Sequence, residues 1–149
     1  MRRFLTDVNT LLALLDPMHV HHEAAHHWYA SQSPLRIVLC SHVENGVIRV
    51  ASQPKYPNCL GTGARVREAL GNFARQVKAE SCPKEISLLD DAIMLKPELL
   101  TPSHITDLYL LALAAANGIR LATFDQRIPA QAVAGGEEAL EIIGSANLP

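Results

Sequence analysis

The sequence has few of the features that mark secreted or membrane-spanning proteins. Its three cysteines, Cys40, Cys59 and Cys82, are odd in number and form no CxxC pair, which argues against a disulfide framework and favours a reducing compartment. No apolar run approaches the roughly 20 residues of a membrane span. The first residues also lack the small-residue cleavage site of a signal peptide. We therefore expect a cytoplasmic protein.

Aromatic side chains are scarce, and neither sign of charge dominates. Aromatic residues make up 5% of the 149 residues and hydrophobic residues 48%, so a core must be built mainly from Leu, Ala, Val and Ile. The formal net charge is −2, whereas a nucleic-acid binder is usually basic. Bound metal ions that neutralise carboxylates would remove this conflict. The length is that of one domain, and we expect residues 1–149 to form it.

Helical and extended patterns alternate along the chain. Strands are expected over residues 4–5, 36–40, 85–88, 119–124 and 140–143. Helices are expected over residues 7–15, 21–31, 41–51, 64–79, 89–95 and 104–117, with Ser103 capping the last and Gly118 ending it. The stretch SQPKYPNCLGTG is expected to be a loop. This alternation predicts an α/β protein with three layers, α/β/α, around a mostly parallel sheet of four to five strands.

Four acidic residues are expected at one end of this sheet. They are Asp7, Glu44, Asp107 and Asp125. Each has an ordinary structural explanation: a helix cap, a capping box with Ser41, a helix-dipole partner and a turn, respectively. However, ligands of open α/β sheets bind beyond the carboxyl ends of the strands, and clustered carboxylates are costly without cations. Hard oxygen ligands select Mg²⁺ or Mn²⁺, so the pattern indicates a metal site that could hydrolyse a phosphodiester.

Three motifs resemble those of the PIN-domain ribonucleases, and in particular the VapC-type toxins of bacterial type II toxin-antitoxin modules. They are FLTDVNTLLALLD, SHVENGVIRVASQPKYPN and HITDLYLLALAAANGIRLATFD. The resemblance covers nearly the whole chain and implies a PIN-like fold whose metal site consists of Asp7, Glu44, Asp107 and Asp125. Asn9 and Thr123 match small polar positions that would orient carboxylates or water.

The resemblance also implies an activity and partners. It implies Mg²⁺- or Mn²⁺-dependent endonucleolytic hydrolysis of RNA, inhibition by a cognate antitoxin and a homodimer. The sequence departs from the family pattern at two positions. His42 stands where a less polar residue is more familiar, and Arg127 stands where an acidic residue is sometimes seen. Weak candidates for phosphate contacts are Arg49, Lys55, Arg65, Arg67, Arg75 and Lys78.

Two other functions fit parts of the sequence. The segment HEAAH matches the zinc-protease pattern H-E-x-x-H, with His22 and His26 as ligands and Glu23 as base. That pattern fixes only three residues in a histidine-rich stretch, and ordinary helix surface is its alternative explanation. The other possibility is a catalytically inactive PIN-like module that binds RNA or a protein partner.

Overall fold

A five-stranded parallel sheet forms the centre of the protein. The computed structural model describes residues 1–144. The strands are β1 (Arg2–Thr6), β2 (Leu35–Leu39), β3 (Glu80–Ser81), β4 (Arg120–Thr123) and β5 (Leu140–Ile142). They lie in the order β3-β2-β1-β4-β5, and all four neighbouring pairs are parallel. The expected sheet type is therefore confirmed, with the last strand at an edge.

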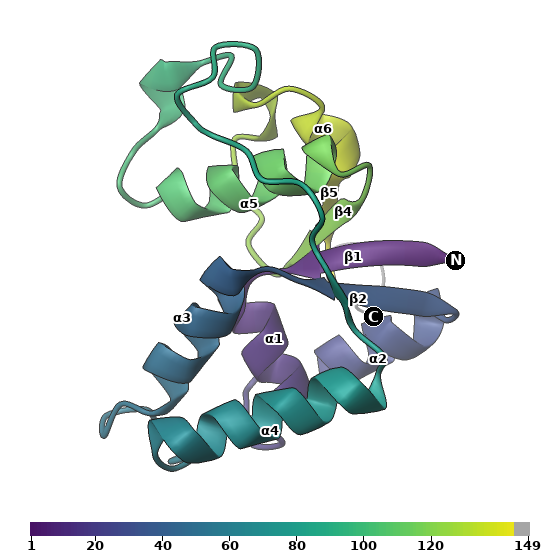
Figure 1. The fold of residues 1–149 in the computed structure, drawn as a ribbon, viewed down its shortest axis with the longest axis vertical. Coiled ribbons are helices and arrows are strands. Elements are labelled where there is room, and N and C mark those ends of the chain that lie inside the picture. The colour runs from purple at the N-terminus through teal and green to yellow at the C-terminus, as the bar shows by residue number, and fades with distance from the viewer. Residues whose placement is uncertain (145–149) are drawn as a thin grey trace.

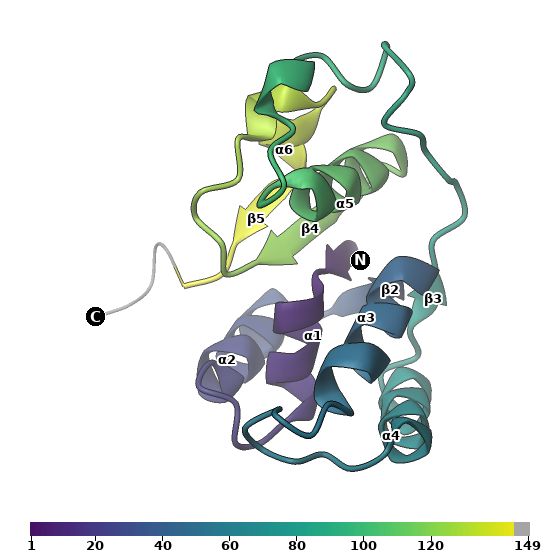
Figure 2. The same ribbon diagram turned by 90° about the vertical axis from the view of Figure 1, so that its left-hand side faces the viewer.

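Helices cover both faces of the sheet (Figures 1 and 2). One face carries α1 (Val8–Leu15), α2 (His22–Gln32), α3 (Ser41–Ala51) and α4 (Gly63–Gln76). The other carries α5 (Ile105–Ala116) and the short α6 (Gly136–Ala139). Two 3-10 turns, η1 (Pro97–Leu99) and η2 (Ala130–Ala132), lie in the connections. These layers confirm the expected α/β/α arrangement.

The direction in which the sheet grows reverses at β1. The chain adds β2 and then β3 on one side of β1, and later adds β4 and β5 on the other. Connections on the two sides run over opposite faces of the sheet, so a crevice opens beyond the carboxyl ends of β1 and β4. Asp7 follows β1 directly, and Asp125 lies two residues after β4. The topology thus brings chain segments more than a hundred residues apart to one place.

Aliphatic side chains fill the space between the layers. Phe4 and Leu5 are consecutive in β1 and both buried, as expected for a strand covered on both faces. Helix α5 is buried through its middle, from Leu108 to Ala114, with only Tyr109 half-buried in that stretch. The ring of Trp28 in α2 packs edge-on against Phe4, with ring centroids 5.0 Å apart.

Helices α1 and α3 approach each other closely at Gly46. A Cβ atom at this position would lie 2.5 Å from Cγ2 of Val8, the first residue of α1. No real side chain fits at that distance, so the glycine permits the contact. The contact brings the first turn of α3, which carries Glu44, toward the helix start that Asp7 caps.

The expected structure of residues 85–95 is wrong. No strand forms over residues 85–88, because the chain leaves β2 after the Cys82 N–H bonds to the Leu39 carbonyl. The Lys84 N–H donates instead to the Asn117 side chain at the end of α5, 3.0 Å away. Residues 89–95 form turns rather than a helix, and Met94 bridges to Val133. These long-range contacts outcompete the weak local pattern.

Several helix ends also differ from expectation. His104, not Ser103, occupies the N-cap position of α5. Helix α4 begins at Gly63, where the Thr62 side chain accepts a hydrogen bond from the Arg65 N–H, and ends at Gln76. Gly118 has the left-handed φ of +67° expected after α5.

Within residues 1–144, no helix has the length and apolar character needed to span a bilayer.

Candidate metal and active site

One buried hydroxyl group connects two of the four acids. The Thr123 Oγ1, at the end of β4, donates to Oδ2 of Asp7 over 2.6 Å and accepts from the Asp125 N–H over 3.0 Å. Thr123 is fully buried, so this arrangement is fixed by the sheet. The other oxygen of Asp7, Oδ1, accepts from the Thr10 N–H and caps α1. Asp7 therefore performs the capping role and still faces β4.

The carboxyl group of Asp107 interacts electrostatically with both Asp7 and Asp125. It stands half-buried in the first turn of α5, on the opposite face of the sheet from α1. Burial raises the pKa of its carboxyl above the ordinary value, and the charges of Asp125 and Asp7 raise it further, while His104 opposes the shift. The Nδ1 atom of His104 is 4.0 Å from Oδ2 of Asp107. Three acids from three segments thus share one electrostatic environment.

Glu44 lies beyond the carboxyl end of β2, in the first turn of α3. Cys40 is the N-cap residue and makes no side-chain cap, so the capping box that was the alternative explanation of Glu44 does not form. Glu44 lines a cleft of about 160 Å³ together with His42 and Tyr109. This position leaves it on the β2 side of the crevice, whereas Asp7 and Asp125 lie on the β1 and β4 side.

The donor set suits a hard divalent cation, although the four acids are not gathered into a closed cage. Within residues 1–144, no three Asp, Glu, His or Cys side chains stand at metal-holding positions around one point. The chemistry of Asp107 nevertheless fits such an ion, because a cation would relieve the burial and like-charge repulsion that its carboxylate experiences. Carboxylate oxygens are the ligands that Mg²⁺ and Mn²⁺ prefer.

Asn9 contacts the histidine-rich segment. Its Oδ1 atom lies 3.0 Å from Nε2 of His19, and Nδ1 of His19 accepts the His21 N–H, also over 3.0 Å. The ring of His21 in turn stacks on Phe124, which precedes Asp125. The role of Asn9 in orienting a carboxylate stays a prediction, whereas the role of Thr123 has direct hydrogen bonds in its support.

The histidines of the HEAAH motif contact the end of α1. Nδ1 of His22 lies 2.8 Å from the Ala13 carbonyl oxygen, and Nε2 of His26 lies 2.9 Å from that of Leu14. Both nitrogens must donate in these contacts, because a carbonyl oxygen only accepts. The histidines thereby satisfy carbonyls of the last turn of α1, which have no partner within the helix. This favours the structural explanation of the motif over a zinc site.

The basic residues fall into two groups by position. Arg67 and Arg75 of α4 line a cleft of about 480 Å³ that also reaches Glu44 and Asn45 of α3. Their side chains therefore border the proposed site on its β2 side. The remaining candidates, Arg49, Lys55, Arg65 and Lys78, do not line this cleft, and all six residues are exposed. Their contact with phosphate stays a prediction.

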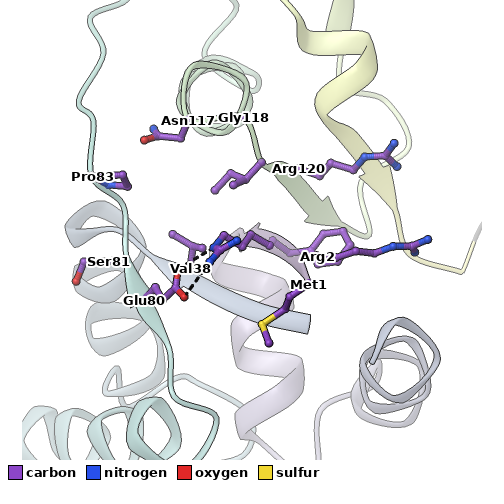
Figure 3. A pocket seen from close by; sticks show the side chains of 12 residues that line it. Met1, Arg2, Val38, Glu80, Ser81, Pro83, Asn117, Gly118 and Arg120 are labelled. Carbon is purple, nitrogen blue, oxygen red and sulfur yellow. Dashed lines mark hydrogen bonds and ion pairs between the residues drawn. The ribbon is translucent and has the colours of Figure 1, made fainter. Parts of the chain in front are cut away.

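A separate cavity lies at the opposite end of the sheet. It measures about 690 Å³ and is bordered by the first residues of β1 and β4, including Arg3 and Arg120 (Figure 3). Arg3 pairs there with Glu80, Nε to Oε2 2.9 Å, and Figure 3 shows Arg2 and Arg120 extending away from this pair. Since Asp7 follows the other end of β1, this cavity is separate from the acids.

The sequence did not point to four side chains that lie near the acids: His104, Tyr109, His21 and Phe124. His104 contacts Asp107 three residues further along the chain. Tyr109 packs against His42, with ring centroids 5.5 Å apart, and Phe124 stacks on His21. The spacing of His104 and Asp107 is visible in HITD, but the two ring pairs join residues 67 and 103 positions apart and leave no local signal.

Comparison with known proteins places the chain in a family. Residues 4–134 match the PIN domain. The chain is 41% identical over 138 residues to Ribonuclease VapC44 of Mycobacterium tuberculosis, covering 89% of this chain and 93% of the relative. It is 34% identical over 122 residues to Ribonuclease VapC38 of the same organism, covering 81% and 84%.

The fold is also found in a solved structure of VapBC2 from Rickettsia felis bound to a promoter DNA fragment. That chain superposes with a TM-score of 0.59 at 15% identity, over 85% of this chain and 93% of the other. At this identity the likeness concerns the fold alone. The domain match, the curated relatives and the parallel sheet agree, and the chain belongs to the PIN-domain family, in its VapC group.

Proposed function

We propose that this protein is a metal-dependent endoribonuclease that hydrolyses RNA phosphodiester bonds with Asp7, Glu44, Asp107 and Asp125. The family assignment and the curated relatives, both named ribonucleases, support the activity. We further propose that residues 1–149 form one domain. The PIN-domain match over residues 4–134 supports this.

One observation carries the proposal for the site. The Thr123 hydroxyl bonds to the Asp7 carboxylate over 2.6 Å and to the Asp125 N–H over 3.0 Å. Burial, and then the charges of Asp125 and Asp7, raise the pKa of Asp107 across the crevice. A protein without a cation to bind gains nothing in stability from such crowding. The structural explanation of each acid taken alone does not account for their convergence.

Asp7, Asp107 and Asp125 would hold Mg²⁺ or Mn²⁺, with Glu44 on the β2 side. When bound, such an ion polarises water and stabilises negative charge on the phosphate. Thr123 fixes the direction of the Asp7 carboxylate. The burial of Asp107 limits the access of bulk water to its carboxylate. Arg67 and Arg75, which line the cleft next to Glu44, orient the phosphates of the RNA strand.

The biological role that fits is the toxin of a toxin-antitoxin pair. The relatives are VapC ribonucleases, and the Rickettsia felis structure is a VapBC assembly. The partners are then RNA, a cognate antitoxin and a second copy of the chain in a homodimer. The three unpaired thiols of Cys40, Cys59 and Cys82 are consistent with a cytoplasmic location.

The test compares isosteric acid-to-amide variants. Wild-type protein should cleave a labelled unpaired oligoribonucleotide in Mg²⁺ or Mn²⁺ and stop when EDTA is added. Asp7→Asn and Asp107→Asn should each lower the cleavage rate about 100-fold or more, equivalent to about 2.7 kcal/mol of transition-state stabilisation. Mg²⁺ should raise the melting temperature of the wild type but not that of Asp107→Asn.

Glu23→Gln is the matched control, because Glu23 is an exposed acid in α2 and would be the base of a zinc enzyme. It should cleave RNA at the wild-type rate. Loss of cleavage in Glu23→Gln together with full activity in Asp7→Asn would overturn the proposal and favour a zinc hydrolase. RNA binding with no cleavage in either metal would instead identify an inactive binding module.

A further inference from the structure

Two pairs of aromatic rings border the proposed site. In one pair the His21 ring lies parallel to Phe124, with centroids 4.5 Å apart and an interplanar angle of 15°. In the other, His42 and Tyr109 lie 5.5 Å apart at 56°. Each pair joins a histidine to a Phe or Tyr ring that lies on a different segment of the chain.

The sheet order places these pairs on either side of Asp7. His42 follows β2, Asp7 follows β1, and Phe124 follows β4, which are neighbouring strands in that order. Neighbouring strands lie about 4.8 Å apart, so the ends of β2 and β4 are about 10 Å apart at this edge. The pairs thus stand at the two ends of the row of acids.

The His21–Phe124 pair is held in place by contacts to the site. Phe124 lies between Thr123, which bonds to Asp7, and Asp125. The backbone of His21 is fixed by Nδ1 of His19, whose other ring nitrogen contacts Asn9. His21 and Phe124 are both half-exposed, and Phe124 also packs against the edge of the core.

The second pair borders Glu44. His42 is exposed and Tyr109 half-buried, and both line the same cleft as Glu44. Tyr109 belongs to α5 and His42 to α3, so this pair spans the two helical layers. Tyr109 packs against the core on one side, and both residues border the cleft.

We propose that the His21–Phe124 and His42–Tyr109 pairs are stacking platforms for the two unpaired nucleobases that flank the phosphate bound at the acids. The inference rests on the proposed function, because it takes the acids as the place where RNA is cut. Aromatic and histidine rings are the side chains on which splayed bases of single-stranded RNA stack. Each pair lies next to at least one site acid, as a base neighbouring the reacting phosphate would require.

The experiment measures stacking directly, without chemistry. An unpaired oligoribonucleotide carrying 2-aminopurine at each position in turn is titrated with the Asp107→Asn protein, and both 2-aminopurine fluorescence and anisotropy are recorded. We expect quenching at two positions. Phe124→Leu should remove the quenching at one and Tyr109→Leu at the other, each weakening binding about 10-fold.

Conservative variants provide the control. Phe124→Tyr and Tyr109→Phe retain a ring and should quench like the parent, and circular dichroism verifies that the leucine variants fold. Absence of quenching in the parent, or quenching that survives both leucine substitutions, would overturn the proposal. The outcome is independent of the nuclease test, since an inactive protein can still stack bases and an active one can cut RNA without stacking.

Discussion

Thr123 shows how one residue can organise a site without taking part in its chemistry. Its hydroxyl group has one hydrogen to donate and gives it to Asp7, and its lone pair takes the Asp125 N–H. This fixes both the carboxylate after β1 and the turn after β4. The sequence predicted a supporting role for Thr123, and the hydrogen bonds give that role a physical basis.

Replacing this hydroxyl group by a methyl group tests that basis. Thr123→Val retains shape and burial but leaves the Asp7 carboxylate without its donor, so we expect RNA cleavage to fall about 10-fold to 100-fold, as for groups that orient metal ligands. Thr123→Ser, which retains the hydroxyl group, should remain near the wild-type rate. Cleavage rates at saturating Mg²⁺ measure the effect. Equal rates for the valine and serine variants would contradict it.

At the scale of elements, the packing of helix on helix positions the acids. Helix α1 starts at Val8 directly after its cap Asp7, and α3 packs on that start through Gly46. A Cβ at Gly46 would lie 2.5 Å from Cγ2 of Val8, so a side chain there must displace Val8 or separate the helices. Either movement would disturb the cap at Asp7.

Gly46→Ala is accordingly expected to destabilise the protein. Overpacking of this kind costs about 1–3 kcal/mol in the free energy of unfolding. The side-chain volume removed by Val8→Ala should compensate for the volume added by Gly46→Ala. The double variant should therefore be more stable than the summed free-energy changes of the two single variants indicate. Urea denaturation of the four proteins measures this. Additive effects would show that the two residues do not compete for space.

At the scale of the whole molecule, a buried acid ties a long loop to the body of the fold. Asp16 follows α1 and is 1% exposed. Its Oδ2 accepts from the Tyr56 hydroxyl over 2.6 Å and from the Asn58 side chain over 2.5 Å, and its Oδ1 accepts from the Met18 N–H over 2.9 Å. These hydrogen bonds fix the loop between α3 and α4 to the C-terminal end of α1.

This network gives the stability of the protein a dependence on pH. Burial acts to raise the pKa of Asp16, but the hydrogen bonds from Tyr56, Asn58 and Met18 prevail and lower it below the ordinary value of an Asp carboxyl. Because the pKa is lower in the folded state, the carboxylate stabilises the protein fully above its unfolded pKa. That contribution is lost as the pH falls through the lowered value.

Asp16→Asn should remove this dependence. We expect a loss of about 1.5–3 kcal/mol at neutral pH, the contribution of hydrogen bonds to a charged group, and a smaller difference from wild type at pH 3 and below. Urea unfolding between pH 7 and pH 2.5 measures both. Asp91→Asn, at an exposed carboxylate, is the control and should be neutral. A difference that stays constant with pH would contradict the assignment.

The sequence by itself determined the elements with strong local signals. The apolar runs of β2 and β4, the long pattern of α5 and the left-handed Gly118 come from local preferences, and they suffice for a parallel α/β sheet. The motifs also identified the four acids as candidates. Local patterns failed over residues 85–95, where contacts to Asn117 and Val133 decide the conformation.

Only the tertiary structure decided how the candidates relate to one another. The reversal of strand order at β1 brings Asp7 and Asp125 to one hydroxyl group, and the helix layer on the other face brings Asp107 within range of their charge. The ring pairs of His21 with Phe124 and His42 with Tyr109 arise in the same way. Sequence spacing carries no information about such contacts, because they depend on the order in which strands pair and on the face that each crossover covers.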